Sequence, residues 1–209
     1  MREILLATNN PGKAKEMFEI LSSSASPLST LIWWRFLSDF PTWPQPIEDG
    51  DTFEANAVLK AHHYARLSGL WTIADDSGLE VDALDGEPGV RSSRYAGDSA
   101  DTVANNTLLV KRLAGVPAER RTARFRCVCV LSDGDNILAR ARGTIEGRII
   151  DEPRGSKGFG YDPHFWVEQS GLTAAEMSPE QKHAISHRGQ ALRRLKDKLL
   201  ELLRPEAVE

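Results

Sequence analysis

The sequence predicts an α/β protein with a mixed central β-sheet flanked by helices. Short apolar runs that end in polar turns alternate with stretches whose apolar residues recur every third or fourth position. A Ser-Asp-Gly-Asp turn at 132–135 joins two stretches of β-pattern and predicts a hairpin, so antiparallel pairs accompany the crossover-connected strands. With 209 residues, the chain is long enough for one large or two-lobed domain, and we expect a single domain over residues 1–209.

The composition is that of an ordinary globular protein, with 41% hydrophobic and 27% charged residues. A net charge of −4 argues against general nucleic-acid binding. The apolar run at the N-terminus is too short for a signal peptide or a membrane span, so we expect a cytoplasmic protein that binds neither nucleic acid nor membrane. Cys127 and Cys129 would share one face of a strand as reduced core residues.

The first half of the chain should contain three strands and two helices. Apolar runs indicate the strands, and apolar residues at every fourth position from Phe53 to Ala65 indicate the second helix. Thr52 is its expected N-cap and Gly69 its expected end. In order, the predicted elements are a strand at Glu3–Ala7, a helix at Lys13–Leu21, a strand at Leu31–Leu37, a helix at Thr52–Ser68 and a strand at Trp71–Ala74.

The second half should hold the hairpin, a glycine-rich loop and a long final helix. Ala123–Leu131 alternates well and predicts a strand, with Phe125, Cys127, Cys129 and Leu131 on one face. Ser178 followed by Pro179 and Gln181 has the form of a capped helix start. In order, the predicted elements are a helix at Asp101–Leu113, strands at Ala123–Leu131 and Asn136–Ile150, a loop at Gly155–Asp162, a strand at Phe165–Val167 and a helix at Arg188–Leu203.

Two polar clusters suggest phosphate and metal chemistry. At the turn between the first strand and the first helix, short polar side chains, a glycine and a lysine suit phosphate oxygens. The residues of this turn are Thr8, Asn9, Asn10, Pro11, Gly12 and Lys13. An ordinary helix cap with a solvated lysine is the commoner explanation of such a motif on its own. Asp75 and Asp76 are predicted to end a strand before a Ser77-Gly78 turn, and with Glu48 they offer the carboxylates that Mg²⁺ prefers. Two solvated acidic loops are the alternative.

Two further clusters suggest recognition of a base. Phe159 and Tyr161 in the glycine-rich loop offer flat faces for stacking, or else a single aromatic anchor. Lys182 supplies positive charge, and His187 and Arg188 supply hydrogen-bond donors for carbonyl oxygens, unless they merely form a solvated basic helix start. The four clusters together describe a site that hydrolyses a nucleoside triphosphate.

Five ordered motifs closely resemble the inosine/xanthosine triphosphate pyrophosphatase family: LATNNPGKAKE, EDGDTFEANAVLKA, IADDSGLEVDALDGEPGVRSSRYAG, GFGYDP and AISHRGQAL. The resemblance extends from residue 4 to about residue 200. It implies a mixed-sheet α/β fold with two lobes around a substrate cleft, a homodimer, and Mg²⁺-dependent hydrolysis of ITP, dITP and XTP to the monophosphate and pyrophosphate.

The resemblance also implies roles for individual residues. Glu48 and Asp76 would bind the metal, with Asp75 nearby, and Asp76 would accept the proton of the attacking water. His187 and Arg188 would read the 6-oxo group of the purine. The residues expected to contact the substrate are Thr8, Asn9, Asn10, Pro11, Gly12, Lys13, Ser77, Phe159, Gly160, Tyr161, Asp162, Lys182, His187 and Arg188.

Two other classes of protein remain open at this point. A purine nucleotide sensor without turnover would keep Lys13, Phe159 and Arg188 but would have no need of the acids. An acidic protein–protein module would show no rise in melting temperature on addition of ITP.

Overall fold

The computed structural model describes residues 1–23, 27–98 and 101–204 of the chain. Its seven-stranded sheet has the order β2-β1-β3-β4-β5-β6-β7. The strands are β1 (Arg2–Leu6), β2 (Ile32–Phe36), β3 (Trp71–Val81), β4 (Thr122–Ser132), β5 (Ile137–Ile149), β6 (Phe165–Val167) and β7 (Leu172–Thr173). The helices are α1 (Pro11–Leu21), α2 (Leu28–Leu31), α3 (Phe53–Ser68), α4 (Thr102–Arg112), α5 (Pro179–Ile185) and α6 (His187–Leu202).

The sheet is mixed, as the sequence predicts. β1 pairs in parallel with β2 and with β3, whereas β6 is antiparallel to both β5 and β7. β2 pairs with β1 along its whole length, from Arg2↔Ile32 to Leu6↔Phe36. Cys127 and Cys129 are buried free thiols, as expected.

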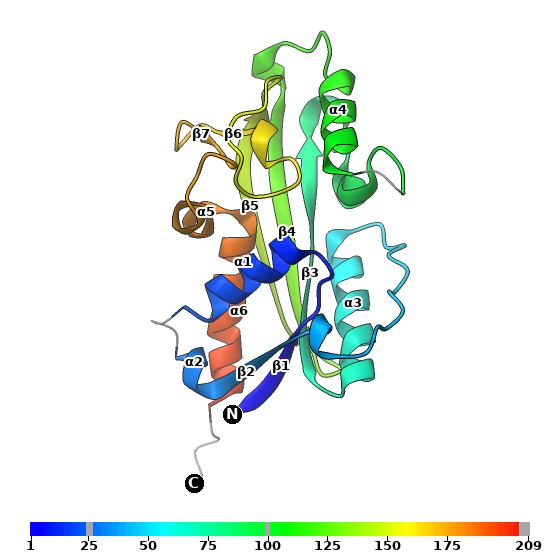
Figure 1. Ribbon diagram of the computed structural model, residues 1–209, viewed down its shortest axis with the longest axis vertical. Helices are drawn as coiled ribbons and strands as arrows, with labels where there is room; N and C mark the ends of the chain where they lie inside the picture. The colour runs from blue at the N-terminus through cyan, green and yellow to red at the C-terminus, as the bar shows by residue number, and fades with distance from the viewer. Residues whose placement is uncertain (24–26, 99–100, 205–209) are drawn as a thin grey trace. The chain divides into compact units, whose positions relative to one another are not determined.

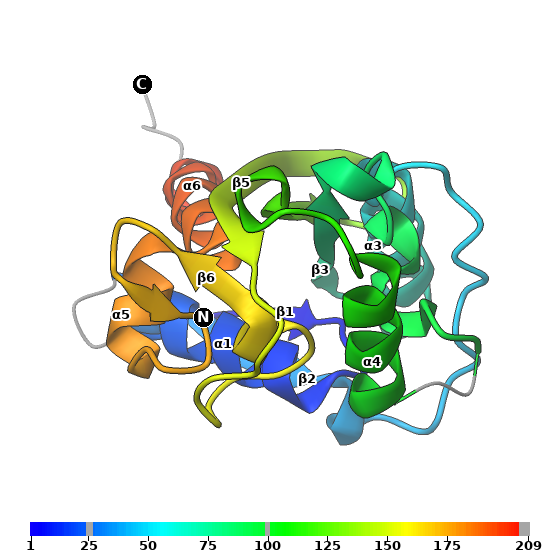
Figure 2. The ribbon, with the colours of Figure 1, turned by 90° about the horizontal axis from the view of Figure 1, so that it is seen from above.

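The chain divides into two compact units. Unit 1 comprises Met1–Asp76, Val128–Arg142 and the C-terminal segment from Arg188, and unit 2 comprises Ser77–Cys127 and Gly143–His187. In unit 1, α1 and α6 lie on one side of β1 and β3, and α3 lies on the other (Figures 1 and 2). The apolar side chains of β1 and the start of β3 are fully buried between these helices, for example Ile4, Leu5 and Ile73.

Unit 2 has its own apolar core. Residues from β3, α4, β4, β5 and β6 contribute to it, among them Leu79, Leu109, Phe125 and Phe165. None of the helices in the described part of the chain is both long and apolar enough to cross a membrane.

The helix ends follow the local sequence closely. Thr52 caps α3 by accepting from the Ala55 amide, and Gly69 ends it at φ 69°, in the left-handed region that glycine adopts without strain. Ser178 and Gln181 form the predicted capping box of α5. α1 begins at Pro11, a residue that suits the first turn of a helix, and Asn10 is its N-cap.

The predicted end of the third strand is wrong. β3 runs without interruption from Trp71 to Val81, so Ser77-Gly78 is not a turn. Cationic side chains on both faces neutralise the two aspartates, and the strand therefore continues through them. Because successive side chains of a strand point to opposite faces, Asp75 and Asp76 are directed to different sides of the sheet.

Candidate active site

The loop between β1 and α1 is shaped by its own short polar side chains. Asn10 Oδ1 accepts from the Lys13 amide at 3.0 Å, and the Asn10 amide donates to Thr8 Oγ1 at 3.2 Å. Asn9 Nδ2 donates to the hydroxyl of Tyr64 on α3 at 3.3 Å. These bonds hold the loop at the N-terminus of α1, where the helix dipole favours an anion.

On the α1 and α6 side of β3, Asp75 lies in a buried ionic network. Arg188 Nη2 lies 3.1 Å and Lys13 Nζ 3.3 Å from Asp75 Oδ2, and Arg188 Nη1 donates to Glu16 Oε2 at 2.5 Å. The side chain of Asp75 is 0% exposed and that of Arg188 is 1% exposed. Burial raises the pKa of Asp75, but the positive charges of Lys13 and Arg188 outweigh it and hold that pKa well below its usual range. Asp75 is therefore a permanent anion matched to two cations.

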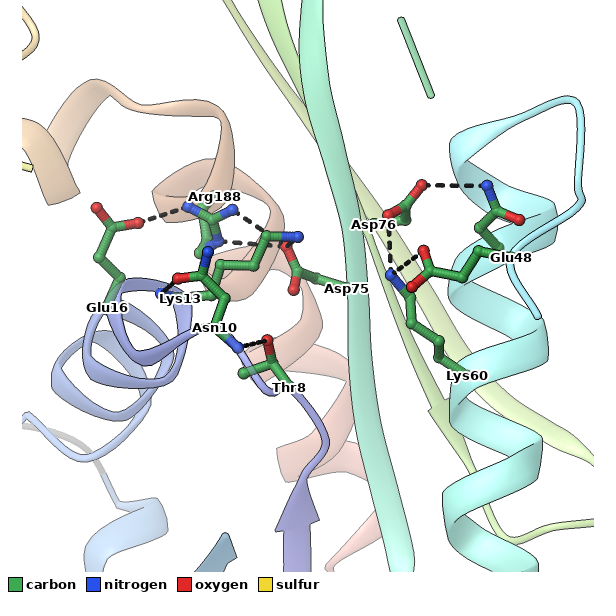
Figure 3. A network of polar contacts seen from close by, with 10 residues as sticks. Thr8, Asn10, Lys13, Glu16, Glu48, Lys60, Asp75, Asp76 and Arg188 are labelled. Carbon is green, nitrogen blue, oxygen red and sulfur yellow. Dashed lines mark hydrogen bonds and ion pairs between the residues drawn. The ribbon is translucent and has the colours of Figure 1, made fainter. Parts of the chain in front are cut away.

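On the α3 side of β3, Asp76 and Glu48 share one cation. Lys60 Nζ donates to Asp76 Oδ1 at 2.8 Å and to Glu48 Oε2 at 2.9 Å. Asn56 bonds both the amide and the carbonyl of Gly50, and its Nδ2 lies 3.5 Å from Asp76 Oδ2. Figure 3 shows the two networks on opposite sides of β3. The chain thus brings two carboxylates from distant positions onto a single positive charge.

The protonation of this second network is set by burial and charge. Burial raises the pKa of Asp76, although the ammonium of Lys60 opposes the shift. Burial alone would lower the pKa of Lys60, but Asp76, Asp75 and Glu48 outweigh it and raise that pKa. Lys60 is therefore charged at neutral pH, and Asp76 is a carboxylate with an increased affinity for a proton.

The donor set fits a Mg²⁺ ion that is shared with phosphates. Across residues 1–23, 27–98 and 101–204, no three His, Cys, Asp or Glu side chains gather closely enough to hold a metal. Mg²⁺ commonly takes only one or two carboxylates and completes its shell with water and substrate phosphates. Glu48 and Asp76 offer two such oxygens to a cation, and Lys60 now holds that position.

The glycine-rich loop in unit 2 is fastened by Asp162. Its Oδ2 accepts from the Phe159 amide at 2.8 Å and from Lys182 Nζ at 2.6 Å. Lys182 Nζ also lies 5.0 Å from the centre of the Phe159 ring. A Cβ at Gly158, whose φ is +75°, would come within 2.1 Å of Asp162 Oδ2, so only glycine fits there. Gly160 O accepts from Asn106 Nδ2 at 2.9 Å.

Tyr161 does not offer the stacking face that the sequence predicted. It is 4% exposed within the apolar core of unit 2, and its hydroxyl donates to Ser92 O at 2.7 Å. Tyr161 instead anchors the loop. Phe159 remains half-buried, and Ser77 is half-buried within β3.

His187 and Arg188, predicted together as purine readers, lie in different surroundings. His187 stacks on Phe125 with ring centres 4.9 Å apart and an interplanar angle of 14°. The guanidinium of Arg188 is turned toward Asp75 and Glu16. Contact of either residue with a purine stays a prediction, and for Arg188 the nearest partners are carboxylates.

Sequence reasoning missed Lys60, Asn56 and Glu16. Asn56 and Lys60 stand four residues apart, and this spacing places both on one face of α3. A polar pair at that spacing beside an apolar stripe was a usable signal. Glu16 gave none, because a single glutamate on a short amphipathic helix usually faces solvent.

The comparisons with known proteins agree with one another. The family model described as "Ham1 family" matches residues 4–198. A "dITP/XTP pyrophosphatase" of Geobacter sulfurreducens is 48% identical over 199 residues, covering 95% of this chain and 97% of the relative. A protein of the same name from Lactobacillus acidophilus is 47% identical, covering 93% of this chain and 95% of the relative.

Solved structures resemble the fold as well. The structure of a HAM1 protein from Coxiella burnetii superposes with a TM-score of 0.83 at 42% identity, covering 96% of this chain and all of the other. The Staphylococcus aureus Ham1 protein superposes with a TM-score of 0.82 at 39% identity, with the same coverage.

Proposed function

Since the chain belongs to the Ham1 family, we propose that it hydrolyses the non-canonical purine nucleoside triphosphates dITP, ITP and XTP to the monophosphate and pyrophosphate, which cleanses the nucleotide pool. It is a hydrolase that acts on the anhydride bond of a nucleoside triphosphate, as its curated relatives are. The convergence of Glu48 and Asp76 on one cation carries the proposal.

Phosphate binding is assigned to the loop between β1 and α1. A triphosphate carries a charge of roughly −4, and this protein is itself negative, so local positive groups have to receive the substrate. Lys13, the N-terminus of α1 and the side chains of Thr8 and Asn10 provide hydrogen-bond donors and positive potential at one place. Arg188 supports this arrangement through Asp75, which holds Lys13.

The proposed cofactor is Mg²⁺, held by Glu48 and Asp76. When bound, it would neutralise phosphate oxygens and stabilise the charge that develops on the leaving pyrophosphate. Lys60 lies against the same two carboxylates, so its ammonium is placed to turn toward the phosphates once another cation takes over the carboxylates.

Asp76 is the proposed general base. Water attacks the phosphoryl group, the bond between the α- and β-phosphates breaks, and the proton of the water passes to the Asp76 carboxylate as pyrophosphate leaves. Asp76 Oδ1 bonds Lys60, whereas Oδ2 makes a longer contact of 3.5 Å to Asn56, which leaves Oδ2 the better placed acceptor.

Purine selection is assigned to Lys182, His187 and the loop at Phe159. A donor aimed at a 6-oxo group is left unpaired by the 6-amino group of adenine, a penalty on the order of 1–3 kcal/mol per buried group. On the basis of the family resemblance, we also propose that the protein is a homodimer and that it acts in the cytoplasm.

An assay of nucleotide products tests the function. The protein is incubated with dITP, ITP, XTP, GTP and ATP in the presence of Mg²⁺, and the products are separated by ion-exchange chromatography. We expect monophosphate and pyrophosphate, with dITP, ITP and XTP far ahead of ATP. Release of diphosphate and orthophosphate would contradict the proposal, and so would binding without turnover, which would favour a sensor.

Replacement of Lys60 tests the competition between lysine and metal. In Lys60→Met, Glu48 and Asp76 lose their internal cation. We expect Mn²⁺ to bind roughly tenfold more tightly without nucleotide, because it no longer displaces the ammonium. The signal of free Mn²⁺ in electron paramagnetic resonance measures this binding. Lys15→Met, at an exposed lysine of α1, is the matched control and should not change it. Unchanged Mn²⁺ affinity in Lys60→Met would refute the shared cation position.

A further inference from the structure

Unit 1 contains a cavity beside the loop between β1 and α1, most of whose walls have no part in the hydrolysis described above. Its volume is about 520 Å³, within the range of pockets that bind small molecules. Its walls come from the loop between β1 and α1, from the segment between β2 and α3, and from Tyr64 on α3. It therefore lies at the carboxyl ends of two parallel strands, where open α/β sheets bind ligands.

Four of the described residues that line this cavity are aromatic: Phe36, Phe40, Trp43 and Tyr64. Phe40 stacks on Trp43 with centres 4.8 Å apart and an angle of 28° between the planes. Trp43 lies 6.4 Å from Tyr64, tilted by 38°, and Phe36 at the end of β2 completes the aromatic wall. His63 Nε2 lies 2.8 Å from Pro44 O, a contact that ties the Trp43 segment to α3. The rings are thus held in place around the cavity.

The polar atoms of the walls are all neutral. None of the residues that the structure describes along the cavity carries a formal charge, and the polar ones supply amides and hydroxyls, including Asn9, Thr42 and Gln45. An aliphatic occupant would leave these groups unpaired, and an ion would find no counter-charge. A flat heteroaromatic ring, with its own donors and acceptors at the edge, matches both the aromatic and the amide surfaces.

The cavity adjoins the phosphate loop. Thr8, Asn9 and Pro11 line it, and the same residues belong to the loop assigned above to phosphate. A ligand with its ring in the cavity would carry its anionic end toward the N-terminus of α1. None of the described wall residues belongs to the set proposed to read the purine.

We propose that this cavity binds the base of a nucleoside monophosphate whose phosphate lies at the loop from Thr8 to Lys13. The inference rests on the proposed phosphate-binding role of that loop. Because the same loop binds the phosphate of both ligands, the monophosphate and the triphosphate cannot bind at the same time. Nucleoside monophosphates, the class of molecule to which the nucleotide product belongs, therefore inhibit the hydrolysis competitively.

The test uses AMP, which the hydrolase does not cleave. Binding is measured by tryptophan fluorescence and by saturation-transfer NMR, and competition is measured against dITP hydrolysis. We expect competitive inhibition by AMP, with much weaker effects of adenosine, which lacks the phosphate, and of ribose 5-phosphate, which lacks the ring. In Phe40→Ala and Trp43→Ala the AMP affinity should fall by roughly five- to a hundredfold, whereas the KM for dITP should change less than twofold.

Trp33→Ala is the matched control, since Trp33 is 63% exposed on β2 and does not line the cavity. It should leave AMP binding unchanged, and the melting temperature of each variant verifies folding. Equal AMP affinity in Trp43→Ala and the parent protein would overturn the proposal, as would a KM for dITP that rises in parallel with the loss of AMP binding. The turnover of dITP by the parent protein tests the proposed function separately. If AMP does not bind in the cavity, the result of that turnover assay is unaffected.

Discussion

Asp76→Asn is expected to abolish turnover of dITP while leaving the protein folded. Loss of a general base typically costs about 10²–10⁴-fold in rate, and the same change also removes a proposed metal ligand. The measurement is pyrophosphate release at saturating Mg²⁺ and dITP. Residual activity within tenfold of the parent protein would exclude Asp76 as the base.

The effect of this substitution on stability should be small. Burial raises the pKa of Asp76, so the folded state favours the protonated carboxyl. The stability that this preference contributes is present below the pKa of the unfolded chain and is lost as the pH rises through the folded pKa. At neutral pH the burial of the charged Asp76 carboxylate therefore lowers the free energy of unfolding, and a neutral asparagine removes this cost. The loss of half of the ion pairing of Lys60 offsets this gain, and we expect a melting temperature within a few degrees of the parent protein's.

Asp75→Asn, unlike Asp76→Asn, is expected to cause a large loss of stability. The change leaves two cations, Lys13 and Arg188, with Glu16 as the remaining carboxylate of the network described above, and the side chain of Arg188 is only 1% exposed. Removing one partner of a buried ion pair typically costs about 3–5 kcal/mol, which for a chain of this size lowers the melting temperature by roughly 6–20 °C. Differential scanning calorimetry of the two asparagine variants at neutral pH measures the contrast. A melting temperature equal to that of Asp76→Asn would contradict the buried network.

The pH dependence of this loss has a defined sign. The pKa of Asp75 lies below its value in the unfolded chain, because Lys13 and Arg188 favour the anion. Its contribution to stability is therefore complete above the unfolded pKa, near 4, and disappears as the pH falls through the lower, folded pKa. The difference in unfolding free energy between the parent protein and Asp75→Asn should accordingly narrow in strong acid.

Much of the fold follows from local rules that a sequence displays. Thr52, Gly69 and the Ser178–Gln181 pair mark helix ends through backbone hydrogen bonds between near neighbours, and such bonds depend little on the rest of the molecule. The alternation in β4 likewise predicts its strand, although burial follows the period of two only in the first half, since every residue from Cys127 to Ser132 is buried.

The site could be predicted only in part, because charge compensation acts across the chain. Two adjacent aspartates resemble the end of a strand until Arg188 on α6 and Lys60 on α3 are known to neutralise them. Tyr161 resembles an exposed stacking platform until its contact with Ser92 is seen. These are tertiary contacts between distant segments, and neither propensity nor periodicity contains them.

The central claim is that Glu48 and Asp76 bind a cation that also holds a polyphosphate. The most direct measurement is a crystal structure with Mn²⁺ and a non-hydrolysable dITP analogue, in which anomalous scattering locates the metal. We predict that Mn²⁺ is ligated by Glu48, Asp76 and phosphate oxygens, with Lys60 Nζ displaced from the carboxylates. Mn²⁺ bound elsewhere, with Lys60 still joining both carboxylates beside the bound nucleotide, would contradict the account.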